Sequence, residues 1–175
     1  YRGLGFYALA LRMPGHGTVP GALTRTEWTD WAAAVRVGAR HVRARAGEGA
    51  PFHIVGYSNG GALAVDYALD VLDGARLPRP DRLVLVSPMI GITGFARFAG
   101  LAGLPAVLPP FARAAWLGVT PEFNPFKYNS FPVNGARQSS LAARTLQAQI
   151  TRYAEAGKLA ELPPIVTFQS VVDFT

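Results

Sequence analysis

One short pattern in this sequence has the residue types and spacing that suit nucleophilic catalysis. It is Gly56-Tyr57-Ser58-Asn59-Gly60, a G-x-S-x-G motif. A serine at a tight strand-to-helix turn projects from the end of a sheet, and glycines on either side let the backbone bend sharply. Ser58 is therefore a candidate nucleophile. The backbone N–H of Asn59, at the start of the helix, is a candidate donor to an oxyanion.

The motif needs a strand before it and a helix after it, and the neighbouring residues predict both. Phe52 to Val55 is an apolar run typical of a buried strand, and a helical stretch rich in Ala, Leu and Val follows to about Leu72. The alternatives are a glycine-rich turn with an incidental serine and a phosphate-binding turn. A Walker-type loop requires Gly-Lys-Ser/Thr, but the first lysine is Lys127, and the motif lacks the G-x-G-x-x-G of dinucleotide sites.

Further apolar runs predict the rest of a sheet. Phe6–Leu11, Leu83–Val86 and Ile165–Phe168 are expected to be strands. Continuous apolar strands separated by helices are typical of a parallel sheet covered on both faces. The predicted fold class is therefore α/β, with a mostly parallel sheet flanked by helices.

A helix is predicted between the first two strands. Thr24 and Glu27 form a capping-box pattern, and apolar residues recur at helical spacing from Trp28 until Gly47. This helix carries an arginine cluster, for which a solvated face is a better explanation than a nucleic-acid surface, because no aromatic stacking pattern accompanies it. The cluster comprises Arg36, Arg40, Arg43 and Arg45. Asp66 and Asp70 are likewise expected on a solvated face of the helix after Ser58.

Composition bounds the class of protein. The chain has 175 residues, 50% of them hydrophobic and 16% charged, which suits one domain with a buried core. Its 19 Gly and 14 Pro show no collagen-like period, so a fibrous protein is excluded. The chain has no cysteine, which excludes disulfides, thiolate metal sites and a cysteine nucleophile.

Residues 94–162 differ in character from the rest and are predicted to form a helical cap inserted between strands. Phe95 to Val119 is strongly apolar, but prolines and arginines interrupt it, so that it is not expected to span a membrane. A last helix is predicted from about Gln138 to Ala156. The predicted division is residues 1–93 as the first part of a core, 94–162 as the cap, and 163–175 as the return strand with an acid-bearing loop.

Together these features resemble the α/β-hydrolase superfamily, in particular its monoacylglycerol-lipase and serine-aminopeptidase-like branch. The resemblance rests on the motif around Ser58, the Pro14-Gly15-His16-Gly17 loop and the cap. It implies an α/β-hydrolase fold and a Ser–acid–His triad, with Ser58 as nucleophile and the acid on a loop after a late strand, where Asp173 stands. A strand-end aspartate without a catalytic role is the alternative for Asp173. Tyr57 and His16 are candidate pocket residues.

The chain departs from the family pattern in its histidines. His16, His41 and His53 all precede Ser58, whereas the family order is Ser, acid, His. His53 lies five residues before Ser58 on the same strand, about 16 Å away in an extended chain. We therefore expect a longer hydrolase, truncated here at both ends, with the triad histidine after Thr175 and a second oxyanion donor before Tyr1. The 175 residues alone are expected to be inactive.

The function implied by the resemblance is that of a serine hydrolase, esterase-like or lipase-like, that cleaves carboxylic esters. The apolar, aromatic cap predicts that the acyl part of the ester is apolar. Such a hydrolase needs no metal and no organic cofactor. A non-catalytic protein with the same fold that binds small molecules or lipids, and a serine peptidase, are the alternatives. No nucleic-acid partner is expected. A membrane surface is a further candidate partner, through the apolar stretch of the cap, and the compartment stays open.

Overall fold

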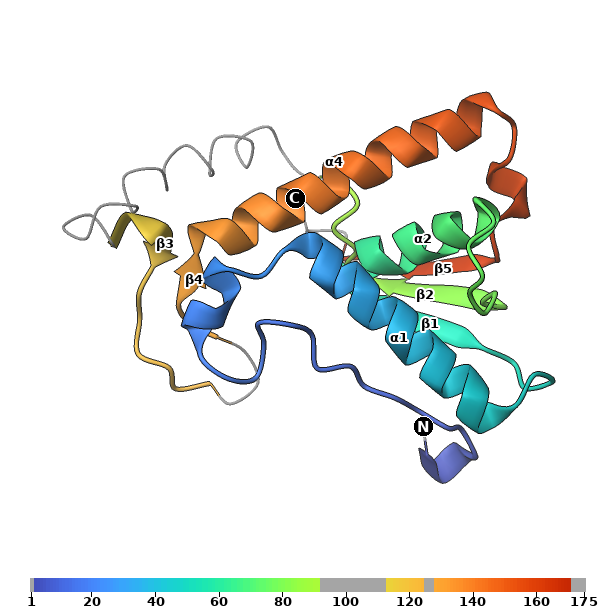
Figure 1. The fold of residues 1–175 in the computed structure, drawn as a ribbon, viewed down its shortest axis with the longest axis horizontal. Helices are drawn as coiled ribbons and strands as arrows, with labels where there is room; N and C mark the ends of the chain where they lie inside the picture. The colour runs from blue at the N-terminus through green and yellow to red at the C-terminus, as the bar shows by residue number, and fades with distance from the viewer. Residues whose placement is uncertain (1, 92–112, 125–127, 171–175) are drawn as a thin grey trace.

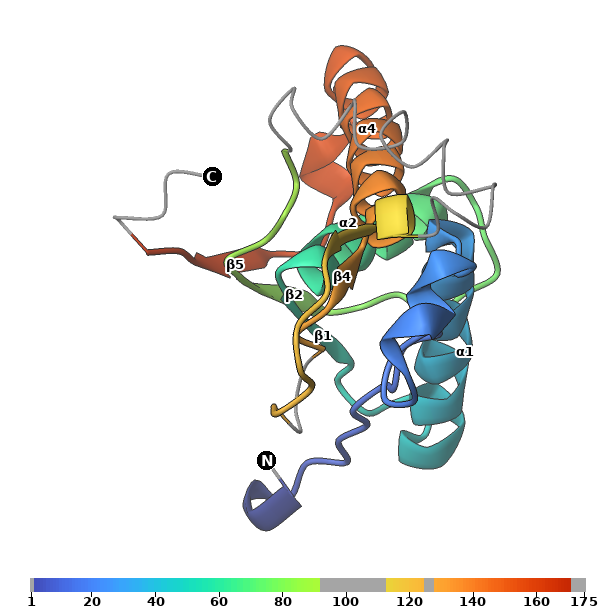
Figure 2. The ribbon, with the colours of Figure 1, turned by 90° about the vertical axis from the view of Figure 1, so that its left-hand side faces the viewer.

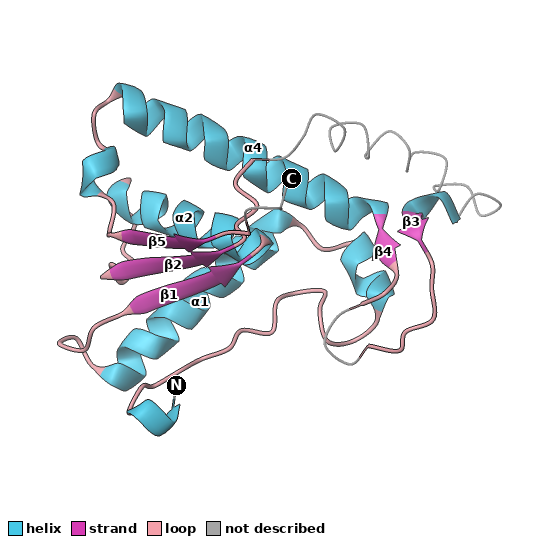
Figure 3. Ribbon diagram, turned by 180° about the vertical axis from the view of Figure 1, so that it is seen from behind, coloured by secondary structure: helices cyan, strands magenta, loops and turns pink. Residues whose placement is uncertain are grey.

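The computed structural model describes residues 2–91, 113–124 and 128–170 of the chain. Its centre is a parallel sheet against which long helices pack. The strands point with their carboxyl ends toward the side of the molecule that carries a small second sheet (Figures 1 and 3). In α/β proteins ligands bind outside the carboxyl ends of parallel strands, so this side is where a site is expected.

Three parallel strands form the main sheet of the described residues. They are β1 (His53–Tyr57), β2 (Arg82–Val86) and β5 (Ile165–Phe168), in the order β1-β2-β5. In this register Val84 lies between Val55 and Val166. The predicted parallel sheet is confirmed, and the strand after Pro164 has its predicted bounds. The strand before Ser58 begins and ends later in the chain than predicted.

Helices cover one face of this sheet and not both. Among the described residues, α1 (Trp28–Ala46), α2 (Asn59–Leu72) and α4 (Val133–Glu155) all lie on one face of the sheet, as Figures 2 and 3 show. This face buries Leu83 and Leu85. The opposite face exposes a set of apolar side chains at alternating strand positions. These are Val55 (58% exposed), Tyr57 (72%), Val166 (40%) and Phe168 (59%). The expectation of two covered faces is therefore wrong for the described part of the chain.

The helix that follows Ser58 is the centre of the core. This helix, α2 (Asn59–Leu72), is buried from Gly61 to Leu69 because it lies between the sheet and both α1 and α4. Its Leu69 is fully buried and belongs to one cluster with Leu85 of β2 and Leu146 of α4. A helix that is apolar on nearly all sides is expected to be enclosed in this way. The position of Ser58 is therefore set by a helix that is buried along most of its length.

The helix before β1 is present, but its capping box lies three residues later than predicted. Helix α1 (Trp28–Ala46) has Glu27 as its N-cap, and the Glu27 N–H donates to Asp30 Oδ2 at 2.9 Å. Thr24 instead ends the short 3₁₀ helix η2 (Pro20–Thr24), where its hydroxyl donates to Gly21 O. The predicted end of α1 at Gly47 is confirmed, where φ is 89°.

The arginine cluster on α1 is only in part a solvated face. The Arg36 guanidinium binds Asp70 of α2 through Nε and Nη2, at 3.0 and 2.6 Å. Arg43 donates to three backbone carbonyls in the loop that follows α1 and lies over the Phe52 ring. Arg40 and Arg45 are exposed. Two of the four arginines therefore bind other parts of the fold: Arg36 binds α2, and Arg43 binds the loop after α1.

The first apolar run is not a strand. Phe6–Leu11 is extended but has no strand assignment, and it lies along α1 (Figure 1). Its Leu11 side chain occupies the space beside Gly38, where an added Cβ would be 2.6 Å from Leu11 Cδ2. The Tyr7 hydroxyl is 3.0 Å from His41 Nε2. Side-chain contacts with α1 therefore replace the expected backbone pairing.

Within the predicted cap, the structure describes one long helix and a small sheet. Helix α4 (Val133–Glu155) begins five residues before the predicted start at Gln138. The antiparallel pair β3 (Trp116–Gly118) and β4 (Phe131–Pro132) was not expected. Two short 3₁₀ helices, η1 (Arg2–Leu4) and η6 (Leu159–Glu161), lie near the two ends of the described chain. Of the helices in residues 2–91, 113–124 and 128–170, none combines the length and apolarity needed to cross a bilayer.

Candidate active site

Ser58 is the single residue between a strand and a helix. Strand β1 ends at Tyr57 and α2 begins at Asn59, so the chain reverses its course at Ser58 alone. Its φ of 52° lies in the left-handed region, which costs a non-glycine residue about 1–3 kcal/mol and occurs where the surrounding structure enforces it. Ser58 is half-buried at the carboxyl end of β1. The tight strand-to-helix turn predicted from the motif is thus present, and the structure adds that its backbone is strained.

Two glycines make this bend sterically feasible, and one of them is not the glycine that the motif suggests. A Cβ on Gly56 would collide with the backbone oxygen of Gly60, and a Cβ on Gly61 would be 2.6 Å from Pro88 Cβ. A Cβ on Gly60 would meet nothing within 4 Å. The close approaches therefore require Gly56 and Gly61, whereas Gly60 faces open space.

The amino end of α2 supplies a positive potential beside Ser58. The first N–H groups of a helix have no partner within the helix, and the helix dipole is positive at this end. Asn59 is the first residue of the 14-residue α2, and no acidic residue occurs in its first turn. The N–H of Asn59 is thus suited to stabilise negative charge that develops on an oxygen next to Ser58.

Comparison with known protein families identifies the family of a chain with this serine between a strand and a helix. A sequence profile described as "Alpha/beta hydrolase family" matches residues 1–171. The chain belongs to the alpha/beta hydrolase family. The comparison with curated proteins finds no match in sequence. Among solved structures, a chain reported with LipS and LipT, two metagenome-derived lipolytic enzymes, superposes with a TM-score of 0.63 at 16% identity, over 90% of this chain and 70% of that chain. That likeness supports the fold of this family member.

The three histidines of this alpha/beta hydrolase family member lie in different places. His53 begins β1, at the end of the strand away from Ser58, and His41 is exposed on α1 beside Tyr7. His16 stacks on Tyr128, with ring centroids 6.1 Å apart and planes at 14°. Its Nδ1 is 3.1 Å from Pro14 O, so Nδ1 carries the proton that this carbonyl accepts. In the described part of the chain, no hydrogen bond joins any of them to Ser58.

Of the remaining site predictions, two can be placed and one cannot. Tyr57 is the last residue of β1 and is 72% exposed on the open face of the sheet, next to Ser58 in the chain. Asp173, the predicted acid, lies outside the described residues. Its role therefore stays a prediction. Asn59 occupies the helix start that the sequence indicated.

The two aspartates of α2 do not lie on a solvated face, and that interpretation is wrong. Asp66 is 6% exposed, and Asp70 binds Arg36. Burial is the main cause that raises the pKa of Asp66 from 3.8 to about 6; the nearby Asp70 carboxylate raises it further, and Arg36 opposes both. The reason is that α2 is covered by α1 on this side as well as by the sheet. Asp66 and Asp70 thus belong to the contact between α1 and α2.

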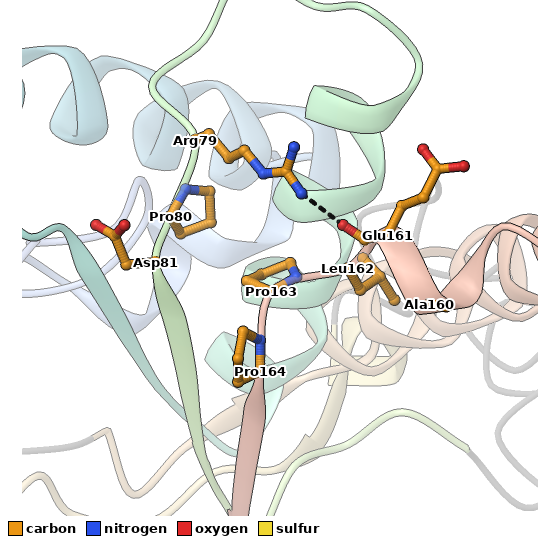
Figure 4. A pocket seen from close by; sticks show the side chains of 8 residues that line it. All are labelled: Arg79, Pro80, Asp81, Ala160, Glu161, Leu162, Pro163 and Pro164. Atoms are coloured by element: carbon orange, nitrogen blue, oxygen red, sulfur yellow. Dashed lines mark hydrogen bonds between the residues drawn. The ribbon is translucent and has the colours of Figure 1, made fainter.

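The structure describes an open cleft that is not at Ser58. It measures about 300 Å³ and lies between the residues that precede β2 and those that precede β5 (Figure 4). Arg79, Asp81, Glu161 and Pro163 are among its lining residues, and Arg79 Nη2 donates to Glu161 O at 2.7 Å. Since it adjoins the amino ends of the strands, it lies at the opposite end of the sheet from Ser58. No group of three side chains suited to a metal ion occurs in the described residues.

Proposed function

We propose that this alpha/beta hydrolase family member is a serine hydrolase that cleaves carboxylic esters, with Ser58 as the nucleophile. The observation that carries the proposal is the left-handed backbone of Ser58 at the junction of β1 and α2. This conformation holds the side chain at the amino end of a helix, where an attacking hydroxyl and an oxyanion donor are both needed. The structurally similar chain was reported with two lipolytic enzymes, which supports the same class of reaction.

The proposed reaction has two covalent steps. The Ser58 oxygen attacks the ester carbonyl while a histidine accepts the hydroxyl proton, and the Asn59 N–H donates to the oxyanion. The alcohol leaves with that proton, and water then attacks the acyl-enzyme and frees Ser58. The proposal keeps Asp173 as the acid that orients the histidine. It places the histidine outside the 175 residues, because none of His16, His41 and His53 is hydrogen-bonded to Ser58 in the described residues.

An apolar acyl group is the proposed substrate portion. The side of the molecule toward which the strands point carries exposed apolar residues of the segment around β3. They are Leu117 (57% exposed), Val119 (58%) and Phe123 (80%). Covering such surface with an aliphatic or aromatic ligand is favourable by about 25 cal/mol per Å². Esters of apolar acids are therefore expected to react faster than acetate esters.

Labelling with a fluorophosphonate probe tests the nucleophile. The full-length protein, which includes the proposed histidine, is expected to take up the probe, and Ser58→Ala in it is expected to abolish uptake, because the probe bonds covalently to an activated serine. Ser139→Ala, on α4, serves as a matched control and should label like the unchanged protein. Labelling that persists in Ser58→Ala would show another nucleophile. An unlabelled protein that still binds a fatty ester would favour the non-catalytic alternative.

A further inference from the structure

The backbone of Ser58 is held on both sides by one short segment of the neighbouring strand end. The Ser58 N–H donates to Val86 O at 2.9 Å, and the Met89 N–H donates to Ser58 O at 3.0 Å. The same Ser58 oxygen also accepts the Gly61 N–H at 2.9 Å, within the first turn of α2. Residues 86–89, here called the Ser87 turn, thus bind both polar backbone groups of the candidate nucleophile.

The Ser87 turn contains the second strained residue of the described chain. Ser58, with φ of 52°, and Ser87, with φ of 41°, are the only non-glycine residues in residues 2–91, 113–124 and 128–170 with positive φ. Tyr57 pairs with Val86 in the sheet, and Ser58 and Ser87 directly follow these two residues. The two strained residues therefore lie side by side at the ends of adjacent strands. Ser87 also precedes Pro88, and a residue before proline is normally driven to extended backbone. Its conformation therefore has to be enforced.

The contacts around Ser87 account for that enforcement. The Ser87 N–H donates to Phe168 O at 2.8 Å, which continues the pairing of β2 with β5. Beyond it, Pro88 packs over Gly61, leaving no room for a side chain there. Only a sharp bend at Ser87 lets the chain leave the sheet, place Pro88 on α2 and return the Met89 N–H to Ser58. The strain at Ser87 is thus coupled to the position of Ser58.

We infer that Ser87 is a positioning residue for Ser58, whose left-handed backbone lets the Ser87 turn bind the nucleophile at both its N–H and its carbonyl. The inference rests on the proposed function only for the meaning of Ser58 as a nucleophile. The geometry it describes can be tested without catalysis. It predicts that side chains which resist positive φ at position 87 displace the reactive atom at position 58.

A single thiol provides the test, because the chain contains no cysteine. In a Ser58→Cys variant the rate of reaction with an aromatic disulfide reagent is measured against pH, which reports the pKa of the thiol. That pKa is expected below its ordinary 8.5, because the group stands at a helix amino end. Adding Ser87→Val, whose β-branched side chain disfavours positive φ, is expected to raise the thiol pKa by about one pH unit and to lower the rate at pH 7 several-fold.

Two further variants separate positioning from general loss of structure. Ser87→Gly accepts positive φ and is expected to keep the thiol profile of the Ser58→Cys protein. Gly74→Val introduces similar strain at φ of 87°, beyond the other end of α2, where a Cβ meets nothing within 4 Å. It is expected to lower stability and leave the thiol profile unchanged. Circular dichroism confirms which variants are folded, and Ser87→Ala replaces Ser87→Val if the latter does not fold.

The results for the inference and for the proposed function can be told apart. An unchanged thiol profile in the folded Ser87→Val or Ser87→Ala protein would overturn the inference, as would an equal change in Gly74→Val. A full-length protein that takes up no fluorophosphonate would overturn the proposed nucleophile instead. The thiol assay would still report whether Ser87 positions residue 58.

Discussion

Replacing Asp66 by asparagine is expected to stabilise the fold at neutral pH, although the position is in the core. Asp66 is 6% exposed, and burial together with the Asp70 carboxylate raises its pKa from 3.8 to about 6 against the attraction of Arg36. As pH rises, the unfolded chain releases this proton first. The free energy of unfolding therefore falls between about pH 4 and about pH 6, by about 1.4 kcal/mol for each pH unit.

The total loss follows from the two pKa values. Their difference of about two pH units corresponds to at most about 3 kcal/mol, reached once the folded state has also ionised. Asparagine has nearly the shape of the protonated acid and carries no charge, so the Asp66→Asn protein avoids the loss. The free energy of unfolding of the variant should exceed that of the unchanged protein least near pH 4. The difference should grow up to about pH 7 and stay constant at higher pH.

Urea unfolding followed by circular dichroism at a series of pH values measures this difference. Glu155→Gln removes the same charge from an exposed position on α4 and controls for the change in net charge. A difference between Asp66→Asn and the unchanged protein that is equal near pH 4 and near pH 8 would refute the argument. It would mean that the folded protein does not retain the Asp66 proton over this range.

Two other substitutions test the local geometry. Gly61→Ala places a Cβ 2.6 Å from Pro88 Cβ, so the Ser87 turn must shift; we expect lower stability and slower fluorophosphonate labelling. Its control, Gly60→Ala, meets nothing within 4 Å and should gain up to about 1 kcal/mol from better helix propensity, without a loss of labelling. Asp30→Ala removes the acceptor of the Glu27 N–H in the capping box and should cost about 0.5–2 kcal/mol in urea unfolding, and no change in stability would contradict that role.

The elements that form the Ser58 bend could be predicted because their signals are local. A short apolar run, a G-x-S-x-G motif and an Ala-rich helical stretch follow one another directly, and β1 and α2 stand there. The position of the capping box, in contrast, does not follow from local signals alone. The three-residue spacing of a capping box occurs at Thr24 and Glu27 and again at Glu27 and Asp30, and only the backbone of Glu27 shows which pair starts α1.

Features that depend on distant parts of the chain were not predictable from local patterns. Phe6–Leu11 has the composition of a strand, but composition does not show whether a partner strand lies alongside; here Leu11 meets α1 instead. Asp66 and Asp70 have the spacing of a solvated helix face, yet α1 covers them. The Ser87 turn has no motif of its own, since its role arises only when β2 is paired beside β1.

The order of strands in the sheet has a consequence for protein synthesis. Strand β2 is the middle strand, but its second neighbour β5 starts at Ile165, 79 positions after Val86. At a translation rate of about 5–20 residues per second, β2 leaves the ribosome about 4–16 seconds before β5 does. During that interval the edge of β2 that later pairs with β5 has free backbone hydrogen-bonding groups. This edge can then pair wrongly with other nascent chains. Codons that slow the ribosome between these strands would be expected to lengthen that interval and to lower the yield of folded protein.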